Sequence, residues 1–315
     1  MNNEYNIESS SFRDNLGNVY NYKDRILRSI KKSGKQNYDF IKDSGLIEAS
    51  VKEKYLVNTY EIEKKSLPEF FNEFEFVLES QVVPCISYPY EWTFEQLKIA
   101  ALHHLDFQIF LFGRGAILRD ASAYNIQFIG SNPIFIDVLS IQKYEDGEYW
   151  SAYKQFCENF LNPLILGSSK GISHNDWFRG ALEGIESKEI NKLLNFRDKL
   201  SYKIFIHVVL QTKFIEKSLN NPKITGTKLK TLKKYPKNSY LGLLHQLRNW
   251  ISKMQFKKDK SIWENYTKEH TYQNLEYQNK KKFVTEFVKR IKPDRIIDLG
   301  CNTGEFSKIS LDAGA

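Results

Sequence analysis

The chain has 315 residues, of which 41% are hydrophobic and 14% aromatic, and its formal net charge is +8. This composition is typical of a folded protein of about two domains and excludes a largely disordered chain. No apolar run approaches the ~20 residues of a membrane-spanning helix, and three distant cysteines and six scattered histidines form neither a disulfide framework nor a metal-ligand pattern. We therefore expect a cytoplasmic protein that lacks a membrane span and a structural metal.

Residues 1–86 predict a small, sheet-rich lobe. Short apolar segments within residues 12–30, 57–60 and 76–78 are bounded by turn-forming residues, as expected of strands. Between the first and the second of these segments, residues 38–52 carry apolar side chains at helical spacing. The lobe leads into the aromatic connector at residues 87–92.

Residues 87–212 predict a second, mainly helical lobe. A long helix is expected from about Trp92 to Phe112, because Thr93 and Gln96 have the spacing of a capping box and apolar residues then recur at helical spacing. Gly113 is expected to terminate it in a left-handed conformation. Further apolar stripes predict helices over residues 149–215, one of them kinked or ended by Pro163.

A polar pattern follows the long helix. Asp120 and Asn125 come first, and a predicted hairpin then leads to a strand that ends in Asp137. The pattern resembles the catalytic loop and the metal-binding Asp of the protein-kinase-like fold. That resemblance implies that Asp120 takes a proton from an acceptor hydroxyl, while Asn125 and Asp137 hold Mg²⁺ on the phosphates of ATP.

The match to the kinase pattern is incomplete. No glycine-rich phosphate loop precedes it, since Gly17 stands alone, and there is no Val-Ala-x-Lys strand. Lys23 and Arg28 are the basic residues near the expected place of that lysine, and Val138 follows Asp137 where a Phe would be expected. A catalytically inert, kinase-shaped scaffold therefore remains an alternative to an atypical kinase or phosphotransferase that uses Mg-ATP.

Residues 213–262 form a basic segment. From Lys213 to Lys260 the only acidic residues are Glu216 and Asp259. We expect a solvated linker and helix between two domains. Basic residues interleaved with aromatic ones can also bind single-stranded nucleic acid, but this alternative is not favoured, because lysine is abundant throughout the chain.

Residues 263–315 predict the start of an α/β nucleotide-binding domain. An amphipathic helix is expected over residues 280–291, a buried strand over 296–299, a glycine turn over 300–304 and a helix over 305–311. Glycines suit such a turn because it visits positive φ and because a Cβ would collide with a ligand lying on the backbone.

The segment Asp298-Leu299-Gly300-Cys301-Asn302-Thr303-Gly304 resembles the first motif of class I S-adenosylmethionine-dependent methyltransferases. The resemblance implies that Asp298, Gly300, Asn302 and Gly304 shape the methionine side of the cofactor pocket, with Asp298 helping to hold the amino group. The second strand, whose carboxylate would hold the ribose, would fall beyond Ala315. We therefore expect a C-terminally truncated fragment that is inactive alone, with an unidentified methyl acceptor.

Several longer stretches resemble bacterial methyltransferases related to nodulation host-specificity proteins. They are residues 12–14, 87–92, 118–128, 135–137 and 153–157, and Trp263 with Tyr266. The resemblance implies an α+β, kinase-like, two-lobed N-terminal region. After it would come the first strand and helix of an incomplete α/β, Rossmann-like methyltransferase domain.

Overall fold

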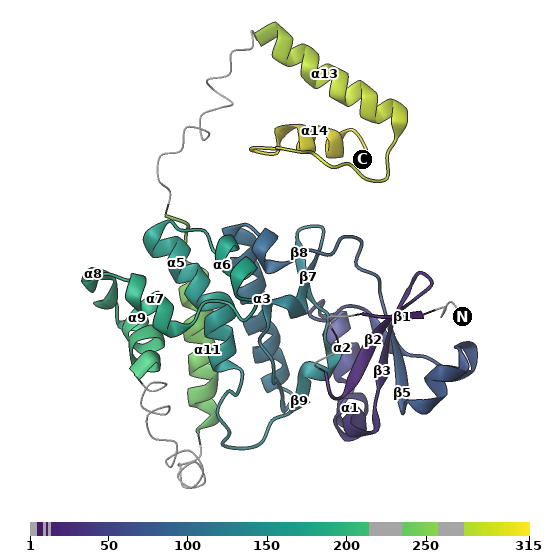
Figure 1. The fold of residues 1–315 in the computed structure, drawn as a ribbon, viewed down its shortest axis with the longest axis vertical. Helices are drawn as coiled ribbons and strands as arrows, with labels where there is room; N and C mark the ends of the chain where they lie inside the picture. Colours follow the sequence, from purple (N-terminus) through teal and green to yellow (C-terminus); the bar gives the residue numbers. More distant parts are fainter. Residues whose placement is uncertain (1–4, 9–10, 12–13, 214–234, 258–273) are drawn as a thin grey trace. The chain divides into compact units, whose positions relative to one another are not determined.

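The computed structural model describes residues 5–8, 11, 14–213, 235–257 and 274–315 (Figure 1). Its contacts divide the chain into two compact units, Met1–Lys257 and Lys258–Ala315. The first unit contains both of the expected lobes, the sheet-rich one before the helical one. The two units are described separately below.

A five-stranded antiparallel sheet forms the first lobe. Its strands follow the spatial order β1 (Tyr5–Ile7), β2 (Gly17–Tyr22), β3 (Arg25–Ile30), β5 (Phe76–Ser80) and β4 (Thr59–Glu61). Gly17 lies inside β2, where a Cβ would come within 2.0 Å of the Ser29 carbonyl oxygen. The lone glycine of this region therefore allows close strand pairing.

Two helices connect β3 to β4 where one was expected. They are α1 (Lys35–Asp43) and α2 (Leu46–Lys52). The break falls at Gly45, which caps the start of α2 with a φ of 61°. Because an L-residue with a side chain rarely adopts that conformation, the glycine separates the two helices.

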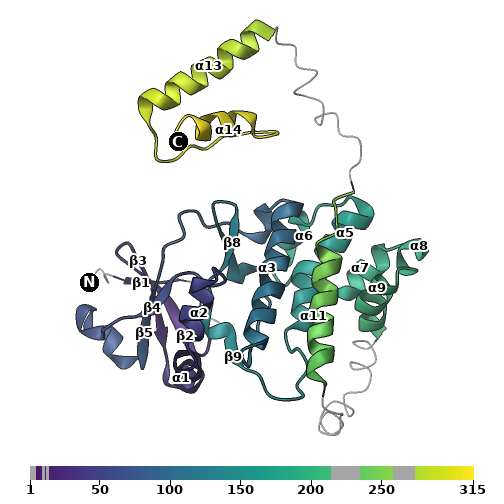
Figure 2. The same cartoon turned by 180° about the vertical axis from the view of Figure 1, so that it is seen from behind.

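Helix α3 (Phe94–Phe112) is the centre of the second lobe, and both views show it between the sheet and the helices on the other side (Figures 1 and 2). The predicted capping box is confirmed: Gln96 N donates to Thr93 Oγ1 at 3.2 Å, and Thr93 N donates to Gln96 Oε1 at 2.9 Å. The expectation for Gly113 is wrong, since Gly113 has a right-handed φ of −62°. The left-handed residue is Gly115, at 74°.

The expected helices after residue 149 are present. They are α4 (Tyr153–Phe156), the π-helical segment η8 (Cys157–Leu161), α5 (Asn162–Lys170), α6 (Asn175–Gly180), α7 (Ser187–Leu193), α8 (Phe196–Lys199), α9 (Tyr202–Ile204) and the π-helical segment η9 (Phe205–Leu210). Pro163 is the second residue of α5, just after η8, so the chain passes the missing N–H by widening one turn rather than by ending the helix. Among the described residues, no helix combines the length and the apolar character that crossing a membrane requires.

Helix α11 (Lys237–Ile251) corrects the expectation of a solvated linker. Its inner side chains are fully buried, namely Tyr240, Leu244, Leu247 and Ile251. Arg248 Nη2 also contacts Asp106 Oδ2 of α3 at 3.1 Å. The predicted helix is therefore present within residues 235–257, but it packs into the core and is not a solvated segment. The rest of the predicted linker lies outside the described residues, apart from Lys213.

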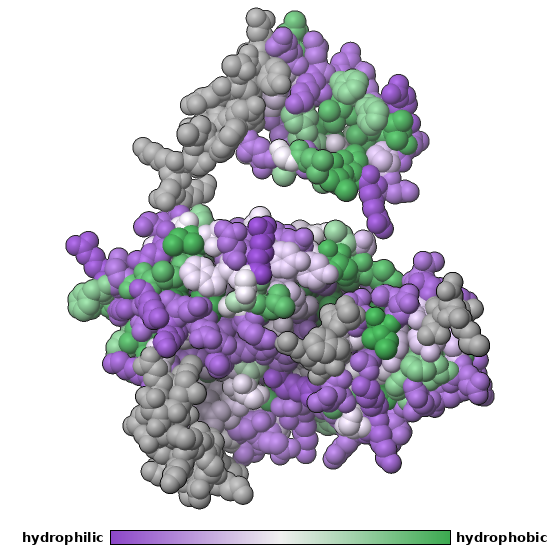
Figure 3. All heavy atoms as spheres, viewed as in Figure 1, coloured by the Kyte–Doolittle hydropathy of each residue, from purple (hydrophilic) through white to green (hydrophobic). Residues whose placement is uncertain are grey.

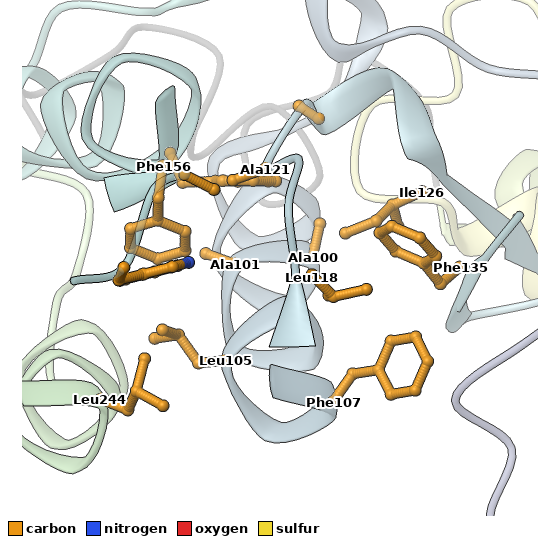
Figure 4. Packing of buried hydrophobic residues seen from close by; sticks show 14 of the residues in the cluster. Ala100, Ala101, Leu105, Phe107, Leu118, Ala121, Ile126, Phe135, Phe156 and Leu244 are labelled. Carbon is orange, nitrogen blue, oxygen red and sulfur yellow. The ribbon is translucent and has the colours of Figure 1, made fainter. Parts of the chain in front are cut away.

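One apolar core runs through both lobes. Figure 4 shows side chains of α3 packed among residues from the later strands, from the helix around Phe156 and from α11. The labelled members are Ala100, Ala101, Leu105, Phe107, Leu118, Ala121, Ile126, Phe135, Phe156 and Leu244. Burying each large apolar side chain contributes about 1.5–3 kcal/mol, so this core supplies most of the driving force for folding.

The second unit consists of α13 (Asn274–Ile291) and α14 (Glu305–Asp312). Glu305 joins the two helices by accepting from the Tyr277 hydroxyl and pairing with Lys281 Nζ at 2.5 Å. Both expected helices are thus present, and the first begins earlier than predicted. The prediction of a buried strand over residues 296–299 is wrong. Ile297 and Leu299 are 84% and 90% exposed, and no described strand pairs with this segment.

Three buried histidines make the first unit sensitive to acid. Burial lowers the pKa of His104 to about 3, and that of His174 and His207 to about 4. In the unfolded chain each imidazole titrates near pH 6.5, so the unfolded state binds more protons between pH 6.5 and about 4. Over that interval the free energy of unfolding falls as the pH falls, whereas above about pH 7 these groups have no effect.

We expect His104→Phe to stabilise the protein and to reduce its acid sensitivity. Neither ring nitrogen of His104 has a hydrogen-bond partner, and the ring lies among Phe135, Phe156 and Phe160. Urea unfolding at about pH 7 and about pH 5 measures the effect, which is at most about 1.4 kcal/mol per pH unit. The exposed His245→Gln variant is the control, and an unchanged pH slope in His104→Phe would contradict the expectation.

Candidate functional site

Two short antiparallel ribbons carry the candidate loop site of the first unit. Strand β6 (Ala116–Leu118) pairs with β9 (Ile141–Lys143), and β7 (Ile126–Ile129) pairs with β8 (Asn132–Phe135). The loop between β6 and β7 holds Asp120 and Asn125, and the loop between β8 and β9 holds Asp137. Ile136 N donates to Asn125 O at 2.9 Å, so the two loops lie against each other.

The first loop is fixed by hydrogen bonds to its own backbone and to the helices behind it. Asp120 Oδ1 accepts from Ser122 N at 2.8 Å, and Asp120 Oδ2 accepts from Asn125 Nδ2 at 3.1 Å. From behind, Gln155 Oε1 accepts from Ala121 N at 2.9 Å. Asp120 and Asn125 are therefore brought together as the kinase-like pattern predicted.

The environment of Asp120 raises the pKa of its carboxyl. Burial raises the pKa of the Asp120 carboxyl, and the neighbouring Asp137 carboxylate raises it further, against the opposing hydrogen bonds. A buried carboxyl with a raised pKa is a better proton acceptor at neutral pH than an exposed one. Asp120 is thus placed and tuned as a general base could be, although local groups already engage both of its oxygens.

Asp137 is held in a structural role. It caps the short helix η7 (Val138–Ser140), with Oδ2 accepting from Ser140 Oγ at 2.7 Å and Oδ1 accepting from Leu139 N at 3.3 Å. Arg28 Nη2 lies 3.1 Å from the same Oδ1. Three groups of the chain therefore already contact this carboxylate.

Arg28 has a larger role than the sequence predicted. It projects from β3, and its Nη1 lies 2.9 Å from Asp14 Oδ2 while its Nη2 reaches Asp137. The three side chains are 14–19% exposed, so the guanidinium bridges two carboxylates largely out of water. The sequence indicated this role only through the presence of a basic residue in a strand of the first lobe. Lys23, the other basic residue considered, lies in the β2–β3 turn.

Arg28 gives the Asp137 carboxylate a positive partner within the chain. Within the described ranges, no group of three or more His, Cys, Asp or Glu side chains is arranged to hold a metal ion. The Arg28–Asp137 contact forms an ion-pair junction between the two lobes. The roles predicted for Asp120, Asn125 and Asp137 in phosphoryl transfer stay predictions.

The glycine turn of the second unit has the predicted conformation. Gly300, Asn302 and Gly304 have φ values of 73°, 47° and 75°. No heavy atom lies within 4 Å of the position that a Cβ would take on Gly300 or Gly304. The chain thus bends through three left-handed residues and leaves their outer face open.

Asp298 is held beside the start of α14. Its Oδ2 accepts from Ser307 Oγ at 2.6 Å, and Gly304 is the N-cap of the helix. The carboxylate and the turn therefore adjoin the start of α14. The carboxylate suits a positive amino group, whereas the helix start, the positive end of the helix dipole, suits an anionic group such as a carboxylate. Cofactor binding by Asp298, Gly300, Asn302 and Gly304 stays a prediction.

We expect Arg28→Gln to lower the free energy of unfolding by about 3 kcal/mol, because it leaves two poorly solvated carboxylates without a counter-charge. The matched control is Arg25→Gln in the same strand. Arg25 pairs with Glu79 at 2.6 Å but is 33% exposed, and its loss should cost about 1 kcal/mol or less. Urea unfolding measures both variants. Equal losses in the free energy of unfolding would show that the Arg28 ion pairs contribute no more than the exposed Arg25 pair.

Comparison with known proteins gives one clear relation. No protein-family model matches the chain. The chain is 40% identical over 308 residues to nodulation protein NoeA of Rhizobium meliloti (strain 1021), which covers 98% of this chain and 64% of that protein. The expected relation to nodulation proteins is confirmed, whereas methyltransferase and kinase activities are not tested by it. The chain is thus a homologue of a nodulation protein, and it spans less than two thirds of that protein's length.

Proposed function

We propose that the chain is part of a class I S-adenosylmethionine-dependent methyltransferase. The observation that carries the proposal is the open, left-handed turn of Gly300, Asn302 and Gly304 next to Asp298. A side chain at either glycine would occupy the face on which a ligand could lie against the backbone. Few other demands on a loop require three left-handed residues within five positions.

The chemistry of these residues fits one side of the cofactor. S-adenosylmethionine supplies an activated methyl group on a sulfonium, and its methionine part carries a positive amino group. The Asp298 carboxylate, oriented by Ser307, would hold that amino group. The backbone of residues 300–304 would support the methionine chain. We assign no residue of this chain to the ribose or to the methyl acceptor.

The proposed activity belongs to a longer protein. The chain spans 64% of the length of NoeA, which is named as a nodulation protein, and the apolar side chains of Ile297 and Leu299 remain exposed. By itself the second unit offers too little buried surface to hold a cofactor firmly. We also propose a cytoplasmic location, because all three cysteines are free thiols.

The test is calorimetric titration of S-adenosylmethionine into R. meliloti NoeA in which residues 274–315 of this chain replace the matching segment. We expect binding, and we expect Asp298→Ala to weaken it by about tenfold or more, since a charged hydrogen bond contributes about 1.5–3 kcal/mol. Asp294→Ala, an exposed acid outside the turn, is the matched control. The proposal fails if the cofactor gives neither heat nor protection from unfolding.

For the first unit we propose a kinase-like fold that serves as a scaffold and not as a phosphotransferase. The observation in favour is the Arg28–Asp137 contact, which gives the carboxylate a permanent counter-charge. The backbone hydrogen bond from Val57 N to Phe135 O and the Asn37 Nδ2 donation to Ile141 O, both 2.9 Å, also tie the two lobes together. Because these contacts hold the two lobes together, the first unit would present a partner or substrate and would not open around a nucleotide.

Mg-ATP binding to the 315-residue chain distinguishes a scaffold from a kinase. We expect ATP with Mg²⁺ to leave the thermal midpoint unchanged, and Asp120→Asn to behave as the parent does. A ligand-dependent rise in the midpoint that Asp120→Asn or Asn125→Ala removes would instead favour the phosphotransferase. ADP without metal serves as the control for weak, non-specific nucleotide binding.

A further inference from the structure

A second feature of the first unit, independent of the proposed methyl transfer, is the tip formed by α7, α8 and α9. Both ribbon views show α8 at the edge of the first unit that lies away from the sheet (Figures 1 and 2). The tip is well anchored, since Ile190 and Leu194 are buried beneath it. The reciprocal bonds between Asn195 and Asp198 cap α8.

The outer face of this tip is apolar. Phe196, Tyr202 and Leu200 are 78%, 70% and 68% exposed. Leu193 and Phe205 are also exposed, so five large apolar residues fall within residues 193–205. The space-filling view shows hydrophobic side chains at the same edge, next to hydrophilic ones (Figure 3). Single exposed apolar residues are ordinary, but a cluster of this kind marks an interaction surface.

Positive charge surrounds the apolar face. Lys188, Lys192 and Arg197 are exposed, and none of them forms an ion pair with another described residue. The negative charge of Asp198 is balanced by Lys170, whose Nζ lies 2.5 Å from Oδ2. Over the described residues 187–213 the sequence has six Lys and Arg against two acids, which are Glu189 and Asp198.

We propose that this tip docks onto an anionic lipid surface. Phe196, Leu200 and Tyr202 enter the headgroup region, and the surrounding Lys and Arg side chains contact the lipid phosphates. Exposed aromatic and leucine side chains ringed by basic residues fit the interface of a bilayer, where apolar burial and electrostatic attraction act together. The protein lies on the surface, in keeping with the absence of a spanning helix among the described residues.

Two other occupants fit the tip less well. A second copy of the chain would bring two clusters of unpaired positive charge together, and like charges at an interface repel. A single-stranded RNA would stack on Phe196 and Tyr202, but it would make no use of the exposed Leu193 and Leu200. Lipid uses the aromatic, the aliphatic and the basic residues at once.

The experiment is co-sedimentation of the 315-residue chain with vesicles of phosphatidylcholine, either pure or containing about 30% phosphatidylglycerol. We expect binding to the anionic vesicles alone. The triple variant F196S/L200S/Y202S should weaken that binding by about tenfold or more. K192Q/R197Q should weaken it severalfold and reduce its dependence on salt.

The control is V82S/I86S, which removes two apolar side chains that are 48% and 53% exposed and lie outside the tip, and it should bind as the parent does. Thermal unfolding of each variant confirms that these surface changes leave the fold intact. Equal binding to neutral vesicles, no binding to either kind, or full binding by the triple variant would overturn the proposal. Two further results would also overturn the proposal if the triple variant abolished them. One is a dimer in light scattering, and the other is binding of oligouridylate without vesicle binding.

Discussion

The burial of helix α3 is the constraint on which the first unit depends. Its side chains meet the strands, the following helices and α11, so most of its surface is covered by protein. A polar side chain on such a helix must find a partner inside the protein. Gln108 does so by donating to Tyr240 Oη at 2.9 Å and accepting from Leu118 N at 2.7 Å. That one amide joins α3, β6 and α11, and so positions the strand that leads into the Asp120 loop.

Outside the apolar core, an ion pair and a hydrogen bond join the two lobes. Arg28 reaches from the sheet to Asp137, and Asn37 of α1 donates to the carbonyl of Ile141. Both contacts hold the segment after β8 against the first lobe. A carboxylate that is partnered in this way fixes geometry at the expense of reactivity, and this supports the proposal that the first unit is a rigid scaffold.

The second unit shows how a local motif can form without its surroundings. The turn at Gly300, Asn302 and Gly304 and the cap of α14 depend on backbone conformations that these residues favour on their own. The segment before the turn differs, because a strand exists only through hydrogen bonds to a neighbouring strand. No described strand pairs with this segment, and its Ile297 and Leu299 are exposed.

Local patterns in the sequence determined the α3 capping box, the order of strands and helices, and the left-handed turn, since each arises from residues close together in the chain. Sequence also brought Asp120, Asn125 and Asp137 into one hypothesis, because the two loops follow short strands. Only the tertiary structure decided that α11 is core rather than linker and that Arg28 binds Asp137. Both depend on residues more than a hundred positions apart in the chain, whose approach is set by packing, and no local propensity encodes it.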